Sequence, residues 1–165
     1  MADDDSLPPR PVLDATGSSD AARADGPLAG VLILDLSQVV SGPMAARELA
    51  DQGADVIKVE PPERRDGMSG LFATVNRNKR SVIIDMKRPE GQALFLQLAA
   101  KADVVMHNMR ENAARKLRCD EPSVREVNPQ IVYCTITGYG FTGPMAAERA
   151  YDPIMQARSG FASMQ

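Results

Sequence analysis

The loop at residues 38–43 is the first place where the sequence could do chemistry. It reads QVVSGP, follows a short apolar run and precedes a run of strong helix formers. Its small residues would let a ligand approach the backbone, and the N-terminus of the following helix would favour an anion. An ordinary turn at the start of a helix also explains Ser41-Gly42-Pro43, and the pattern alone favours that turn. The chain has no GxGxxG and no P-loop pattern, which weakens the prediction of a dinucleotide site.

Basic side chains crowd a second stretch. It contains a single acid, Asp85, and five cations, namely Arg77, Lys79, Arg80, Lys87 and Arg88. Arginine grips a phosphate with two parallel hydrogen bonds and lysine acts as a point charge, so the stretch suits a small ligand with several phosphates. A solvated basic edge is the open alternative. A nucleic-acid surface is disfavoured, because aromatic residues make up only 4% of the chain.

A glycine-rich loop and a carboxylate follow later in the chain. Residues 137–144 read TGYGFTGP, and their three glycines, Gly138 among them, could line a thioester or acyl group closely. Turn formation alone explains such a string equally well. Tyr151 and Asp152 then place a phenol beside a carboxylate ahead of an expected helix, and on spacing alone Asp152 is expected to be its N-cap.

Scarce cysteine and histidine exclude several kinds of site. Cys119 and Cys134 are the only cysteines, and without a secretory signal or a CxxC pattern both are expected to be reduced in a cytoplasmic protein. His107 is the only histidine, so neither a Ser-His-Asp triad nor a metal site is expected. The longest apolar run, residues 31–34, is far shorter than the roughly 20 residues that span a bilayer. No membrane role is expected.

Alternating strands and helices must position these residues. Short apolar runs predict strands at residues 31–36, 55–59, 81–85, 104–106 and 131–135. Proline starts and helix formers predict helices at residues 44–50, 89–101 and 122–127 and from residue 154, and Gly53 is expected to end the first of them. The alternation predicts an α/β fold with a largely parallel sheet, flanked by helices, whose ligand loops follow the carboxyl ends of the strands.

Residues 1–28 differ in composition from the rest. They hold six acids and two bases, a local charge of −4, so the net charge of −3 leaves +1 on residues 29–165. Without a sustained apolar period this stretch cannot offset its ordering entropy. It is expected to be a disordered acidic lead.

An ordered set of short motifs runs through residues 29–165. The motifs are GVL at 30–32, SGP at 41–43, LADQGADVIKVE at 49–60, NKRS at 78–81, DMK at 85–87, PEG at 89–91, ADV at 102–104, NP at 128–129, GYG at 138–140, YD at 151–152 and SG at 159–160. Each motif is weak alone, but in this order they resemble family III coenzyme A transferases. That family includes formyl-CoA transferase, carnitine CoA-transferase and alpha-methylacyl-CoA racemase.

The resemblance implies a Rossmann-like large domain, incomplete in this chain, that binds coenzyme A along its strand ends and holds no tightly bound cofactor. It places Val40 and Ser41 near the thioester and the pantetheine arm. Around the nucleotide end it places Ile84, Lys87, Asn108, Met109 and Lys116. Arg77 and Gly138 are expected to contribute from the basic stretch and the glycine-rich loop. The usual Glu-Asn-Phe-Arg-Pro-Gly passage reads HNMREN at residues 107–112, which removes an aromatic residue from the adenine side.

The resemblance also implies a reaction. Family transferases use an aspartate that attacks the acyl-CoA thioester, and the Gly-Asp motif that carries it is expected beyond Gln165. Asp152 matches a second active-site carboxylate and Tyr151 a neighbouring tyrosine, so both are expected to support catalysis. Racemases of the family place a histidine where Tyr151 stands, which disfavours a racemase-like isomerase.

The favoured hypothesis is the N-terminal, CoA-binding part of an acyl-CoA:carboxylate CoA-transferase. Its partners would be an acyl-CoA, a carboxylic acid and, at full length, a second copy in an interlocked homodimer. The 165-residue chain is expected to be inactive alone. A noncatalytic CoA-binding remnant of a truncated gene is the open alternative.

Overall fold

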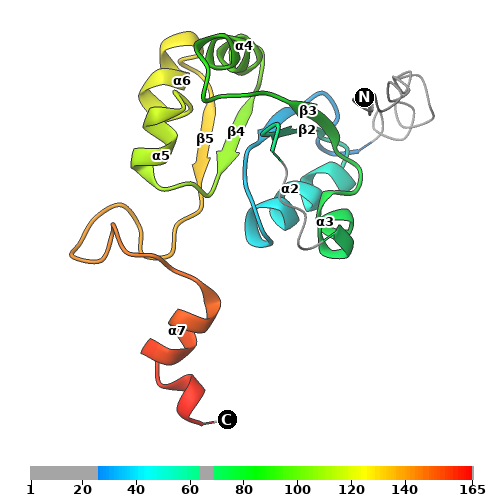
Figure 1. Cartoon of the computed structure of the whole chain (residues 1–165). Coiled ribbons are helices and arrows are strands. Elements are labelled where there is room, and N and C mark those ends of the chain that lie inside the picture. Colours follow the sequence, from blue (N-terminus) through cyan, green and yellow to red (C-terminus); the bar gives the residue numbers. More distant parts are fainter. Residues whose placement is uncertain (1–25, 64–68, 165) are drawn as a thin grey trace, which may run out of the picture.

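A five-stranded parallel sheet forms the centre of the molecule (Figure 1), whose computed structural model describes residues 26–63 and 69–164. The strands are β1 Leu32–Asp35, β2 Asp55–Glu60, β3 Arg80–Ile83, β4 Val104–His107 and β5 Val132–Thr135. Their order is β3-β2-β1-β4-β5, and every neighbouring pair is parallel. The predicted α/β fold with a parallel sheet is confirmed. Residues 1–25, most of the expected acidic lead, lie outside the described residues.

Helices connect the strands. They are α2 Ser41–Asp51, α3 Ser69–Asn76, α4 Pro89–Ala99, α5 Glu111–Lys116, α6 Glu121–Val127 and α7 Asp152–Arg158, with a 3₁₀ turn at Phe161–Ser163. The sequence did not predict α3 or α5. Both are at most eight residues long, and so short an apolar period does not separate a helix from a loop. Gly53 follows the end of α2 with a φ of 100°, as expected.

Two apolar cores lie on opposite faces of the sheet. Figure 1 shows α2 and α3 on one face and α4, α5 and α6 on the other. Because successive strand side chains alternate, Ile33 packs with Ala46 of α2, whereas Leu34 packs with Phe95 of α4. Full burial of a side chain such as Phe95 contributes about 1.5–3 kcal/mol. Because helices cover both faces of the sheet, strand side chains on both faces are apolar, and the strand sequences are continuous apolar runs.

The chain after β5 leaves the sheet, and α7 extends away from its helical layers (Figure 1). No residue of α7 is buried. The predicted N-cap at Asp152 is wrong, because Tyr151 occupies that position and Asp152 is the first helical residue. The Asp152 carboxylate instead accepts a hydrogen bond from Gln156 Nε2, one turn along the helix.

Candidate functional site

The strand order creates a switch point between β1 and β4. The chain leaves β1 toward α2 on one face and leaves β4 toward α5 on the other, and ligands of open parallel sheets bind where the connections diverge in this way. Asn108, directly after β4, joins the two loops. Its side-chain amide donates to the Gln38 carbonyl at 2.7 Å and accepts from the Gln38 N–H at 2.9 Å. These two hydrogen bonds therefore join the two loops at the same edge of the sheet.

The loop after β1 is strained and open to solvent. Val39 has a φ of 70°, a conformation that a β-branched residue adopts only when its surroundings impose it. The side chains of Val39, Val40 and Ser41 are exposed. Among the described residues, no side chain caps the start of α2. Val39 and Val40 thus present an apolar surface beside the helix N-terminus at Ser41, which suits an apolar chain attached to an anion.

Gly42 lets α2 start against the end of the β1 loop. A Cβ on Gly42 would lie 2.3 Å from Ser37 Cβ and 2.5 Å from Ser37 Oγ. We expect Gly42→Ala to lower the free energy of unfolding by about 1–3 kcal/mol, because the buried Ser37 cannot move aside. Urea denaturation measures this. Gly70→Ala is the matched control in α3, where an added Cβ meets nothing within 4 Å, and an equal loss in both variants would contradict the expectation.

Beneath this loop lies a buried charge cluster of Asp35, Lys58, Lys79 and Ser37. Lys79 Nζ donates to Asp35 Oδ2 at 2.8 Å, and Lys58 Nζ lies 3.3 Å from the same oxygen. The Asp35 carboxylate also accepts from the Ser37 N–H at 2.9 Å and from the Ser37 hydroxyl. Burial by itself raises the pKa of Asp35, but the two ammonium groups and these hydrogen bonds outweigh it and hold that pKa below its ordinary value.

Sequence reasoning missed this cluster as a unit. It assigned Lys79 to a phosphate-binding stretch, whereas the side chain of Lys79 is only 1% exposed and turned toward Asp35. The available signal was a charged residue inside or at the end of an apolar strand, at Asp35 and again at Lys58. A buried charge is retained only with a partner, so two such residues in neighbouring strands suggest a pair.

Four of the five residues expected at the nucleotide end, all except Asn108, fall into one neighbourhood. Ile84 is buried in the core beneath α4, and Met109 packs against the same core. Lys87 and Lys116 are exposed. Gln92 Nε2 in α4 donates to the carbonyls of Met86 and Lys116, which brings the segment after β3 next to the end of α5. The two exposed cations suit the phosphates of a nucleotide.

Arg77 is separate from that neighbourhood. It pairs with Asp51 at the end of α2, and α2 runs from the carboxyl edge of the sheet to its amino edge. Arg80 and Arg88 pair with Asp55 and Asp85. The structure therefore does not gather the five cations of residues 77–88 into a single phosphate site.

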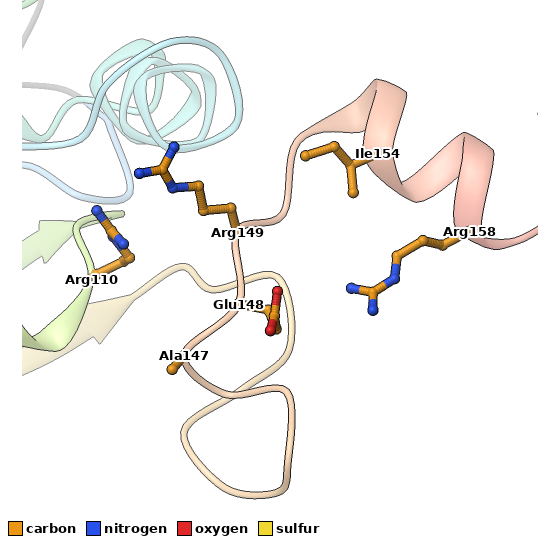
Figure 2. A pocket seen from close by; sticks show the side chains of 6 residues that line it. All are labelled: Arg110, Ala147, Glu148, Arg149, Ile154 and Arg158. Carbon is orange, nitrogen blue, oxygen red and sulfur yellow. The ribbon is translucent and has the colours of Figure 1, made fainter.

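Three arginines surround an open cavity near the start of the projecting segment (Figure 2). The cavity has a volume of about 590 Å³, and it is lined by Arg110, Ala147, Glu148, Arg149, Ile154 and Arg158. Arg110 follows β4, and Figure 2 shows the Arg149 side chain extending toward it. Within the described part of the chain, Arg110 and Arg149 form no ion pair. Sequence reasoning overlooked these arginines because they are dispersed along the chain.

The glycine-rich loop and the Tyr151-Asp152 pair lie beside this cavity in the sequence but contribute no lining side chain. A Cβ on Gly138 would lie 1.9 Å from Ala150 Cβ, so close packing of the two segments accounts for this glycine. Tyr151 is 60% exposed. Asp152 is exposed as well. Their predicted catalytic roles remain predictions.

His107 fixes the start of the loop after β4. The Met109 N–H donates to His107 Nδ1 at 3.1 Å, and His107 Nε2 lies 2.6 Å from the Tyr133 hydroxyl, which donates to the Cys119 carbonyl. Since the tyrosine proton is engaged, Nε2 carries the ring proton and the imidazole is neutral. Burial lowers the pKa of His107, in agreement with this state. The only histidine therefore has a structural role in the described geometry.

Several other site types find no support in residues 26–63 and 69–164. No group of three or more His, Cys, Asp or Glu side chains there could hold a metal ion. No described helix is long and apolar enough to cross a membrane. Cys119 and Cys134 are both free, and burial raises the pKa of Cys119 to about 12, which makes it a poor nucleophile.

The five-stranded parallel sheet agrees with the family that sequence comparison identifies. The model of CoA-transferase family III matches residues 28–165, and the chain belongs to this family. It is 40% identical over 163 residues to succinate–glutarate CoA-transferase of Agrobacterium fabrum, covering 88% of this chain and 41% of that protein. It is 41% identical over 145 residues to succinyl-CoA:glutarate CoA-transferase of Mus musculus, covering 81% and 33% respectively.

Solved structures of similar proteins have the same fold. A CAIB/BAIF family protein from Brucella suis has a TM-score of 0.76 and 38% identity, over 82% of this chain and 39% of that one. Rv3272 from Mycobacterium tuberculosis has a TM-score of 0.77 and 35% identity, over 85% and 40%. The chain thus spans between a third and about two fifths of the length of these relatives.

Proposed function

We propose that this chain supplies the coenzyme A-binding part of an acyl-CoA:carboxylate CoA-transferase. The observation that carries the proposal is the switch-point edge, where Asn108 ties the loop after β4 to the strained, exposed loop after β1. This edge offers Val40 and Ser41 to the pantetheine arm. The curated relatives are named as transferases that act on succinate, glutarate and oxalate or their CoA thioesters.

The charges around the edge support a ligand with phosphates at one end. Lys87 and Lys116 are exposed, and the half-buried Met109 packs against the same core as Ile84 close by, so the two lysines could hold the nucleotide portion. Arg110 and Arg149 face the same open cavity, and a guanidinium binds phosphate or carboxylate with two parallel hydrogen bonds. We therefore assign anionic groups of the acyl-CoA to this cavity.

In the proposed reaction a carboxylate oxygen attacks the thioester carbonyl, the C–S bond breaks and the CoA thiolate leaves, which produces a mixed anhydride. The thiolate then attacks the enzyme's acyl carbon to give an enzyme-bound CoA thioester and a free acid, and an acceptor carboxylate reverses both steps. The family resemblance assigns the nucleophile to an aspartate in a Gly-Asp motif beyond Gln165. The described residues would bind and orient CoA, with Tyr151 and Asp152 in supporting roles.

The relatives' names favour transfer over isomerisation, and Tyr151 stands where family racemases carry a catalytic histidine. The proposal includes a homodimer in the cytoplasm. Its support is the family resemblance together with two free cysteines, which fit a reducing compartment.

The arginine cavity gives a direct test. We expect Arg110→Met and Arg149→Met each to weaken coenzyme A binding about tenfold, because each variant loses a charge-assisted hydrogen bond. Isothermal titration calorimetry of the chain with coenzyme A measures this. Pantetheine lacks the phosphates and should bind all variants equally.

Arg115→Met is the matched control, since Arg115 is exposed on α5 and pairs with Glu111 at 2.6 Å. Failure of the unmodified chain to bind coenzyme A would count against the proposed function. Unchanged affinity in both cavity variants would remove the cavity from the site.

A further inference from the structure

The buried charge cluster forms hydrogen bonds to both ends of the loop at residues 37–43. At the start of the loop, Asp35 Oδ1 accepts from the Ser37 N–H at 2.9 Å, and Lys58 Nζ donates to the Ser37 carbonyl. At its end, in the first turn of α2, Lys79 Nζ donates to the Pro43 carbonyl at 2.7 Å. The exposed residues Val39 and Val40 lie between these two attachments.

The cluster is closed and inaccessible. Lys79 Nζ has three acceptors, the Pro43 carbonyl, Asp35 Oδ2 and Asn76 Oδ1 at 2.9 Å, which match the three N–H bonds of an ammonium group. The side chains of Asp35, Lys58 and Lys79 are 0%, 7% and 1% exposed. None of the three can touch a ligand outside the protein, so each acts on a ligand only through the loop.

Strain in the loop explains why it needs such attachments. Val39 holds a positive φ, and a strained conformation persists only where the surrounding structure over-determines it. The attachments come from two separate strands and from the segment between α3 and β3, since Lys58 lies in β2 and Lys79 directly precedes β3. The Lys79 bond to the Pro43 carbonyl thereby connects the segment after α3 to the end of the loop.

We propose that Lys58 and Lys79, held by Asp35, are positioning residues that fix the loop at residues 37–43 for the thioester end of an acyl-CoA. The inference rests on the proposed function, because that function assigns the thioester end to Val40 and Ser41. It adds that a cluster without ligand contact sets the affinity of the site.

Lys79→Met tests the proposal, since methionine keeps the length and packing of the side chain but makes none of its three hydrogen bonds. Hydrogen exchange is measured for the Ser37 and Met44 amides, which are bonded to Asp35 and to the Val40 carbonyl. We expect their exchange to accelerate at least tenfold, with that of Val105 and Met106 in β4 unchanged. Coenzyme A affinity should fall by about the same factor.

Arg80→Met is the matched control, because it removes the neighbouring cation, whose partner Asp55 lies at the start of β2. It should change neither loop exchange nor affinity. Equal acceleration at all amides of Lys79→Met, or an unchanged loop, would overturn the positioning role.

Two further outcomes are separable. If the unmodified chain does not bind coenzyme A, the proposed function fails, while the exchange measurement still decides whether the cluster holds the loop. If Lys79→Met does not fold, Lys79→Gln replaces it, because its amide keeps a donor. Failure of both variants to fold would also overturn the proposal, since Lys79 would then be required by the whole fold rather than by the loop.

Discussion

Asp35→Asn is expected to lower the free energy of unfolding by about 3–5 kcal/mol, the cost of leaving buried charges without their partner. The substitution keeps the shape of the side chain but removes the charge that Lys58 and Lys79 share. Both ammonium groups remain buried, with only carbonyl and amide oxygens to accept from them. Guanidinium denaturation followed by circular dichroism measures the loss. Asp51→Asn, which removes a carboxylate paired with Arg77 at the protein surface, should cost much less.

Low pH should lower the free energy of unfolding through protonation of Asp35. The pKa of Asp35 in the folded protein lies below its ordinary value of 3.8, so the folded state binds this proton less readily than the unfolded chain. The stabilisation is therefore fully present above pH 3.8 and is lost as the pH falls through the lower, folded-state pKa. Denaturation between about pH 7 and about pH 2 should show this loss in the unmodified chain and a smaller loss in Asp35→Asn. Identical pH profiles would contradict the assignment.

The five strands and the helices α2, α4, α6 and α7 were predictable because each rests on a local pattern, whereas the short helices α3 and α5 were not. All five strands coincide with apolar runs, and Pro89 marks the first residue of α4. The order of the strands in the sheet does not follow from apolar runs or from prolines at helix starts. Nothing local places β4 beside β1, yet that pairing creates the switch point and sets the Asn108 amide against Gln38. The ligand edge could be expected from the fold class, but the contact that stiffens it could not.

The buried charge cluster could not be predicted from local sequence patterns either. Lys79 is 44 residues from Asp35 in the sequence, and in a list of basic residues it looks identical to Arg77 and Arg80. Tertiary contacts separate the three, because Lys79 is bonded to the buried Asp35, whereas the exposed Arg77 and Arg80 pair with Asp51 and Asp55. Charge composition showed that the stretch is cationic, but it could not assign the burial that separates a residue such as Lys79 from a solvated one.

Asn108→Leu is expected to weaken coenzyme A binding by about 2–3 kcal/mol, or roughly 30- to 150-fold. Leucine has the same branching as asparagine but can neither accept from the Gln38 N–H nor donate to the Gln38 carbonyl, so both backbone groups lose their partner. The loop after β1 would then have to be ordered at the expense of binding free energy. Calorimetric titration with coenzyme A measures the loss, and Asn112→Leu on α5 is the control for a surface leucine.

Asn108→Asp separates the two halves of this contact. Aspartate can still accept from the Gln38 N–H but cannot donate to the Gln38 carbonyl, so its affinity should fall between those of the unmodified chain and Asn108→Leu. A graded series would mean that the amide acts by holding the loop, because a group that only contacted the ligand would not follow the hydrogen bonds to Gln38. Equal affinities in all three proteins would show instead that the edge is ordered without Asn108, and the stiffness of the switch point would then have to come from the buried cluster alone.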